Sequence, residues 1–319
     1  MNYTNEEYLE IYKTMSYARK FSLVFEEYAM KGILPGFHHL SLGQEGLTVG
    51  VWTERGENDW IMPAHRCRPM FGWGTDIEAY LAEILGKKTG LCGGLSGDSH
   101  IYVPQYRVGP SSGMLGYSQN MGVGVALAYK LKKVDGCVVI GIGDGGFEEG
   151  VISEALNMIA IWKLPVVFYI DNNGYGISTP AKYSSAINDL SERAAGFGLP
   201  GSSYDATDVF LVKDVMHEAM AKARRGEPSV VEFRTNRWQG HFVGDPATYR
   251  DPAEVEEAKM NRDPMKWCRN FMLLHKVATE AEMDAIDQER EAYVRSIVEK
   301  TLAAPGKTRE DVLRPVFAD

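Results

Sequence analysis

The sequence predicts an α/β protein built on a parallel β-sheet. Residues 137–173 carry the clearest evidence, because two short apolar runs, CVVIGI and VVFYID, flank a segment with the apolar period of an amphipathic helix. Two strands joined in this way form a βαβ unit with a right-handed crossover. A further strand is expected at 230–235, after a helix at 208–225. Of 319 residues, 45% are hydrophobic and 24% are charged, which is typical of a globular chain and excludes disordered and collagen-like classes.

Helices are expected on either side of this unit. One covers residues 6–31 and ends at Gly32 and Pro35, another begins at Gln44–Glu45, and a third lies near 76–86. These segments show helical spacing of apolar residues, bounded by glycine, proline or polar residues. We expect helices at the N-terminal end of the domain as well as at its C-terminal end.

Residues 89–120 form an unusually long glycine-rich loop. Loops of this length inside a domain are usually functional or disordered, and the Leu, Ile, Tyr, Val and Met residues here argue against disorder. Beyond residue 251, acidic helices dominate, and one of them opens with the capping box Thr279–Glu282. We therefore expect one domain over residues 1–319, with a core at about 36–250 and a helical extension at 251–319.

The charge balance excludes several classes of protein. With 34 Lys and Arg against 43 Asp and Glu, the formal net charge is -9, whereas a nucleic-acid binder normally shows a basic excess. No run of eighteen apolar residues exists to span a membrane. The opening MNYTNEEYLEIY is acidic, unlike a secretory signal. We expect a cytoplasmic protein without nucleic-acid or membrane partners.

The four cysteines predict neither a zinc site nor a disulfide framework, because no CxxC pair occurs. Cys137 opens an apolar strand and is expected to pack there. Cys67 lies between Arg66 and Arg68, whose charges would lower the pKa of a thiol. A tolerated small residue is nevertheless the simpler interpretation of Cys67.

Polar residues follow two of the predicted strands where each strand ends. Asp144 stands between Gly143 and Gly145, and Asn173 follows the next strand. Ligands collect at the carboxyl ends of parallel strands, so these side chains are expected to converge. An Asp carboxylate, an Asn carbonyl and one backbone carbonyl suit Mg²⁺, which takes its remaining oxygens from water or a diphosphate. The glycines let the backbone approach phosphates and offer N–H groups at a helix start.

The segment from Gly143 to Gly176, GDGGFEEGVISEALNMIAIWKLPVVFYIDNNGYG, resembles the diphosphate-binding motif of thiamine diphosphate enzymes. More narrowly, the chain is similar to the α subunit of the thiamine diphosphate-dependent 2-oxo acid and acetoin dehydrogenases. Six further motifs in family order carry this resemblance over nearly the whole chain: HLSLGQE (39–45), HR (65–66), TGLCGGLSGDSH (89–100), GMLG (113–116), RWQGHFVGDPATYR (237–250) and RDP (262–264). The resemblance implies a parallel-sheet thiamine diphosphate-binding domain with helices on both faces and helical N- and C-terminal extensions.

By position, the resemblance implies contacts to thiamine diphosphate and Mg²⁺. These are Asp144, Asn173 and the Tyr175 carbonyl for Mg²⁺, the Gly145 and Gly146 amides with Arg66 for the diphosphate, and Gly113 and Leu115 for the rings. The Gly113 backbone would contact the aminopyrimidine. Leu115 would keep the cofactor bent, so that its amino group can deprotonate the thiazolium carbon.

Three histidines are catalytic candidates by the same resemblance. His241 lies on the loop that the family uses to contact diphosphate and substrate, and His39 and His65 would line the same cavity. Addition of the cofactor to a carbonyl needs proton donors with a pKa near neutrality, which histidine offers. The Arg66 guanidinium provides a permanent, forked charge for phosphate. Because a lone histidine is more often structural, only the flanking motifs single out His39 and His241.

The cofactor's pyrimidine needs a carboxylate that this chain does not supply. In the family, that glutamate comes from a second domain, and one βαβ core leaves room only for the diphosphate-binding domain. Glu45 lies near the substrate loop and Glu154 lies in the crossover helix, so neither is expected to face the pyrimidine. The resemblance implies a β subunit that supplies the catalytic glutamate in an α₂β₂ assembly, with an apolar partner surface at 113–125 and 148–163. The acyl group would pass to a lipoyl transacylase.

The substrate is expected to be a small ketone or 2-oxo acid. His65, where tyrosine occurs in relatives, and Phe242 favour the acetoin-cleaving branch over pyruvate or branched 2-oxo acids. Phe242 also has no hydroxyl to phosphorylate, where the mitochondrial pyruvate enzymes carry a regulatory serine. The alternative is a two-chain transketolase-like or decarboxylating thiamine diphosphate enzyme without a lipoyl partner. A nucleotide- or Mg²⁺-binding interaction domain is poorly supported, because the chain has no GxxxxGK[ST] loop and no GxGxxG after a strand.

Overall fold

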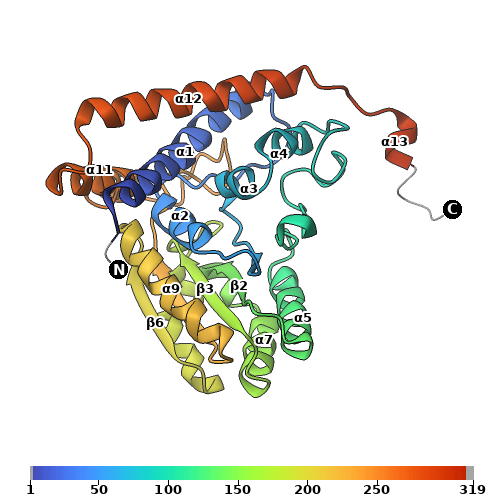
Figure 1. Ribbon diagram of the computed structural model, residues 1–319, viewed down its shortest axis with the longest axis vertical. Coiled ribbons are helices and arrows are strands. Elements are labelled where there is room, and N and C mark those ends of the chain that lie inside the picture. Colours follow the sequence, from blue (N-terminus) through green and yellow to red (C-terminus); the bar gives the residue numbers. More distant parts are fainter. Residues whose placement is uncertain (1–2, 314–319) are drawn as a thin grey trace.

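The computed structural model describes residues 3–313, in which a parallel β-sheet has helices on both faces, as the sequence predicts (Figure 1). Within that range the sheet has five strands, all paired in parallel, in the order β1 (Trp60–Met62), β2 (Val138–Gly143), β3 (Val166–Asn172), β7 (Ser229–Arg234) and β6 (Gly201–Asp205). A short antiparallel pair, β4 (Tyr175–Gly176) and β5 (Thr179–Pro180), follows β3. No helix in the described range is long and apolar enough to span a membrane.

Each face of the sheet is covered by its own group of helices. One face packs against α1 (Asn5–Met30), α2 (Glu45–Thr53), α3 (Arg68–Gly74), α4 (Ile77–Ile84) and α9 (Val209–Arg224). The other packs against α5 (Tyr117–Lys132), α7 (Gly150–Ile161) and the 3₁₀ helix η2 (Leu190–Phe197). Shorter elements in the loops are η1 (Pro104–Tyr106), α6 (Asp144–Phe147) and α8 (Ala181–Ser184).

The acidic helices after residue 251 form the expected extension. They are α10 (Pro252–Asn261), α11 (Pro264–Leu274), α12 (Glu280–Leu302) and α13 (Arg309–Leu313). In Figure 1, α12 runs along α1, and α13 lies away from the sheet. The predicted capping box is confirmed, because the Glu282 backbone N–H donates to Thr279 Oγ1 at 3.3 Å and the Glu282 carboxylate accepts from the Thr279 backbone at 2.8 Å.

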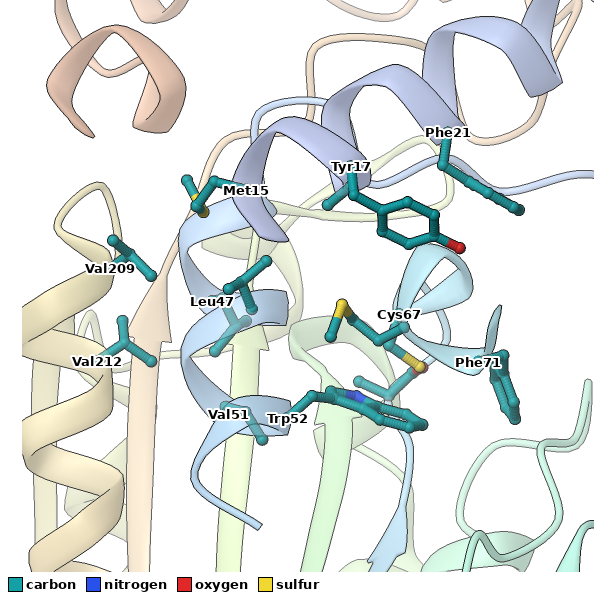
Figure 2. Close-up of a cluster of buried hydrophobic side chains, with 14 of the residues drawn as sticks. Met15, Tyr17, Phe21, Leu47, Val51, Trp52, Cys67, Phe71, Val209 and Val212 are labelled. Carbon is teal, nitrogen blue, oxygen red and sulfur yellow. The ribbon is translucent and has the colours of Figure 1, made fainter. Parts of the chain in front are cut away.

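The larger core lies between the sheet and α1, α2, α3 and α9 (Figure 2). Helices α2 and α9 cross closely because Gly50 has no side chain: a Cβ there would lie 2.5 Å from Val212 Cγ1. Cys67 and Cys137 are both buried, in agreement with the packing interpretation. The Cys137 thiol donates to Asp59, and burial raises its pKa.

A buried carboxylate orders the first part of the glycine-rich loop. Glu83 of α4 accepts the backbone N–H groups of Cys92, Gly94 and Ser96, each at 2.7 Å, and the Ser96 hydroxyl at 2.8 Å. A Cβ on Gly90 would lie 2.7 Å from Glu83 Cα, so the loop can pass this close only with glycine there. The loop is therefore ordered, as its composition predicts, by a residue outside it.

The predicted end of that loop is wrong. Helix α5 begins at Tyr117, directly after Gly116 in a left-handed conformation (φ 88°), so residues 117–120 are helical. Glycines inside α5 hide its helical character from sequence patterns. They serve packing instead, since a Cβ on Gly122 would lie 2.7 Å from Met62 Cγ and 2.9 Å from Ile140 Cδ1.

Candidate active site

The candidate metal ligands lie at one edge of the sheet. Gly143 at the end of β2 pairs in register with Asp171 of β3, so Asp144 and Asn173 both follow at the carboxyl ends of adjacent strands. The backbones beyond them touch, since a Cβ on Gly145 would lie 2.7 Å from the Cα of Gly176. The βαβ unit thus brings the GDG turn against the Asn-Asn-Gly-Tyr turn.

Two oxygens at this edge lack hydrogen bonds. Asp144 Oδ2 and Asn173 Oδ1 are buried without a hydrogen-bond partner among residues 3–313. Burial, together with the nearby Asp171 carboxyl, raises the pKa of Asp144 to about 7. A buried carboxylate and a buried amide oxygen without partners fit a divalent cation with oxygen ligands. Tyr175 begins β4 two residues after Asn173, which places its carbonyl on the same turn.

Polar residues that the sequence did not single out lie behind this edge. Asp171 accepts from Thr235 Oγ1 at 2.6 Å, and burial raises the Asp171 pKa to about 6. With its amide nitrogen turned inward, Gln44 donates to both Asp171 oxygens, at 3.1 and 2.9 Å. Gln44 stands in the HLSLGQE motif, so this motif offered a signal, whereas Thr235 offered none.

The three predicted histidines come together from segments far apart in the chain. The ring centroids of His39 and His65 are 4.1 Å apart, and those of His39 and His241 are 4.6 Å apart. His39 Nε2 lies 3.3 Å from His241 Nε2. The result is a cluster of three imidazoles, which we call the histidine cluster (His39, His65 and His241).

Arg66 connects the histidine cluster to the buried carboxylates. Its guanidinium donates to the His241 carbonyl at 2.7 Å and to Leu40 O at 3.0 Å, and its positive charge also acts on Asp171. Arg66 Nη2 faces His241 Nδ1 at 3.4 Å, which makes that ring nitrogen an acceptor and leaves the hydrogen of a neutral ring on Nε2. His241 can therefore hold a proton at Nε2, the atom that faces His39.

Burial lowers the pKa of His241 to about 4, with Arg66 and Arg237 as further causes. We expect a ring titration midpoint near pH 4, measured by ¹⁵N-histidine NMR and assigned with His241→Gln. The ordinary pKa of a histidine ring is 6.5, so in the unfolded chain His241 becomes protonated at a higher pH than in the native state. His241 therefore lowers native-state stability as the pH falls from 6.5 towards 4. A midpoint above pH 6 would contradict this picture.

A second arginine, Arg237, holds the loop that carries His241. Buried Arg237 donates to the Ile177 carbonyl at 2.8 Å and to the Tyr249 hydroxyl at 2.9 Å. Asp245 accepts from the His241 backbone N–H at 2.5 Å and from the Tyr249 hydroxyl at 2.7 Å. Ile177 has φ 55°, a strained conformation for a β-branched residue next to the metal-site turn. Arg237, Asp245 and Tyr249 lie within a matched motif, and Ile177 directly follows another, but none of them was predicted to be a site residue.

Gly113 and Leu115 lie beside an open hollow rather than in the histidine cluster. This hollow of about 840 Å³ is lined by Gly113, Met114, Leu115, Tyr117, Asn120, Met121, Glu149 and Val151. Leu115 is 43% exposed, and its Cδ1 lies 3.3 Å from a Cβ placed on Gly146. Leu115 therefore borders the glycine turn that follows Asp144.

Comparison with known proteins identifies similar chains of nearly the same length. The family model described as dehydrogenase E1 component matches residues 12–310. The α subunit of acetoin:2,6-dichlorophenolindophenol oxidoreductase from Cupriavidus necator is 36% identical, over 98% of this chain and 94% of the relative. The protein of that name from Bacillus subtilis is 34% identical over 99% and 95%. The pyruvate dehydrogenase E1 component subunit alpha of Zymomonas mobilis is 33% identical over 96% and 87%.

Proposed function

This chain belongs to the dehydrogenase E1 component family, and from that premise we propose that it is the α subunit of a thiamine diphosphate- and Mg²⁺-dependent dehydrogenase. It cleaves acetoin or decarboxylates a 2-oxo acid such as pyruvate, and the acyl group passes to a lipoyl transacylase. Residues 1–319 act as one thiamine diphosphate-binding domain, with its core at about 36–250. Similar chains include mitochondrial and chloroplastic proteins as well as bacterial ones, so a cytoplasmic location stays a prediction.

One observation carries this proposal. Asp144 Oδ2 and Asn173 Oδ1 are buried without hydrogen-bond partners in the described part of the chain, at adjacent strand ends. These two oxygens and the Tyr175 carbonyl would hold Mg²⁺. Gly145 lies against the Gly176 backbone, so a glycine is needed where the turns that carry Asp144 and Asn173 meet.

For the remaining cofactor contacts we propose the residues that the motif resemblance implies. The Gly145 and Gly146 amides and Arg66 bind the diphosphate, and Gly113 and Leu115 contact the rings. When bound, thiamine diphosphate supplies a nucleophilic thiazolium carbon that adds to a carbonyl and stabilises the resulting negative charge.

The chain's own residues orient the substrate and move protons. His241, neutral at physiological pH, presents Nε2–H to a substrate oxygen in the cavity. Arg66 keeps a positive charge beside this ring and fixes its tautomer. The His39 ring packs against both His65 and His241, so His39 and His65 would line the substrate site together with His241.

Membership of the family as an α subunit implies a β subunit and a lipoyl acyltransferase as partners. We propose that the β subunit also supplies the glutamate for the pyrimidine, in an α₂β₂ assembly. Glu45 does not serve, because Arg19 binds one carboxylate oxygen at 2.5 Å and the Gly43 N–H binds the other at 3.0 Å. Glu154 is exposed on α7.

The surface that the β subunit would cover is apolar. Met114, Tyr117 and Met121 are 67%, 52% and 41% exposed around the hollow that Leu115 borders. Ile161 at the end of α7 is 66% exposed. Apolar patches of this kind mark protein interfaces, and these residues fall in the two segments predicted to contact the partner.

We expect the isolated chain to be catalytically silent, because we propose that the carboxylate for the pyrimidine comes from the β subunit. The test supplies thiamine diphosphate, Mg²⁺ and 2,6-dichlorophenolindophenol with acetoin, pyruvate or a branched 2-oxo acid, first to the purified chain and then after co-purification with its β subunit. Activity only in the co-purified protein supports the proposal, and the preferred substrate identifies the branch. Robust turnover by a verified single-chain preparation would overturn the two-subunit assignment. Adding a lipoyl domain tests acyl transfer, whose absence would favour the alternative without a lipoyl partner.

A further inference from the structure

A fourth histidine, His38, stands next to the histidine cluster and forms a buried pair that the proposed function does not use. His38 and Asp98 are 2% and 8% exposed, and His38 Nδ1 lies 2.8 Å from Asp98 Oδ2. The other ring nitrogen, Nε2, lies 3.3 Å from the Leu34 carbonyl. One ring nitrogen therefore contacts a carboxylate and the other a backbone carbonyl.

Three segments of the candidate active site meet at His38. Its side chain binds Asp98 in the glycine-rich loop, and its backbone carbonyl accepts the Val243 N–H at 2.9 Å, on the loop of His241. The next residue is His39, whose ring contacts His65 and His241. His38 thus lies one residue from the histidine cluster without being part of it.

Burying such a polar pair is energetically unfavourable compared with burying apolar side chains. Removing two polar groups of this kind from water is unfavourable, and apolar residues of similar volume would pack there without that desolvation penalty. A buried polar pair can instead fix register, because its hydrogen bonds are satisfied in one arrangement only. The glycine-rich loop is a suitable anchor, since Glu83 fixes its backbone from Cys92 to Ser96.

We propose that His38 and Asp98 are positioning residues: their pair locks the segment before His39 onto the glycine-rich loop and so sets His39 against His241. The distance that depends on this lock is the 3.3 Å between His39 Nε2 and His241 Nε2. Neither His38 nor Asp98 is a proposed Mg²⁺ ligand, so we expect the pair to act on substrate turnover and not on Mg²⁺ binding. The kinetic consequence rests on the proposed function, whereas the structural consequence does not.

The structural arm uses ¹⁵N-histidine NMR on the full chain, without cofactor or substrate. Asp98→Asn removes the charge at nearly constant size, and His38→Gln removes the ring. Both variants are expected to shift the ring signals of His39 and His241, assigned by His39→Gln and His241→Gln, and to leave those of His217 and His275 in place. The matched control is His217→Gln, which breaks the exposed contact between His217 Nδ1 and Glu54 at 3.2 Å and should leave the histidine cluster unchanged.

The kinetic arm uses the complex with the β subunit. Each variant should lower kcat by about 10- to 100-fold, the effect of a misplacement of about 1 Å, with less than a two-fold change in the Kd of thiamine diphosphate. The double variant His38→Gln/Asp98→Asn leaves no unpaired charge, and it also serves if a single variant fails to fold. As a control for stability, Asp59→Asn disturbs the ion pair between the buried Asp59 carboxylate and Arg224, and it should preserve kcat per folded molecule.

The outcomes separate the two proposals. Unchanged His39 and His241 signals in folded variants would overturn the positioning role, whether or not the complex is active. A wild-type complex without activity, together with shifted signals, would contradict the proposed function and leave the lock supported. Shifted signals with unchanged kcat would show that the lock does not serve turnover and would also overturn the inference.

Discussion

Replacing Asp144 with alanine is expected to abolish Mg²⁺-dependent binding of thiamine diphosphate while the fold stays intact. Asp144 is the charged member of the proposed ligand set. Even the loss of a residue that only hydrogen-bonds to a metal ligand typically lowers metal affinity by about 10- to 100-fold. We therefore expect the Kd to rise at least about 100-fold. The fold should survive, because burial opposes ionisation of this carboxyl, whose pKa is raised to about 7.

Calorimetry with and without Mg²⁺ measures this effect, and circular dichroism monitors the fold. Asp205→Ala is a matched control, because Asp205 also ends a parallel strand, β6, but at the edge of the sheet, where it contacts Arg262 at 3.1 Å. This control should bind the cofactor normally. Unchanged affinity in Asp144→Ala would remove Asp144 from the metal site.

Replacing His241 with alanine is expected to lower turnover by about 10²- to 10⁴-fold in the complex with the β subunit. The variant loses the Nε2–H that the Arg66 contact leaves facing the cavity. It keeps the backbone carbonyl that Arg66 binds and the backbone N–H that Asp245 accepts, so the loop should remain in place. The loss should therefore appear mainly in kcat.

Steady-state kinetics with acetoin or pyruvate measure this effect, and cofactor affinity is measured in parallel. His217→Ala removes a histidine of α9 that lies outside the site and should retain full turnover. If His241→Ala stays within a few-fold of the wild type, His241 is a structural residue, and proton transfer must be assigned to His39 or His65.

The sequence could predict the elements whose signals are local. The βαβ unit of β2, α7 and β3 has apolar runs of strand length around a helical period, and parallel pairing then places Asp144 beside Asn173. Strand β6 was missed because its sequence, GSSYD, has no apolar alternation. It forms at the edge of the sheet because β7 offers it backbone hydrogen bonds.

The contacts that complete the site are pairings between distant parts of the chain, which a single sequence does not specify. Gln44 contacts Asp171, and Arg237 reaches Ile177, because the fold brings these segments together. The sequence gives only a weak indication of the pair of His38 and Asp98: two adjacent histidines, and a carboxylate in a glycine-rich loop. The histidine cluster was predictable through motif resemblance, not through any pattern of spacing.

The four hydrogen bonds accepted by Glu83 have a consequence for the thermodynamics of cofactor binding. They keep residues 92–96 ordered before any ligand binds. The conformational entropy of this part of the loop is therefore lost when the chain folds, and not when the ligand binds. A site on a loop ordered in advance binds with a smaller entropic penalty than one that must order the loop on contact. The amide hydrogens of Cys92, Gly94 and Ser96 should then exchange slowly with solvent at the same rate in the free and the ligand-bound protein.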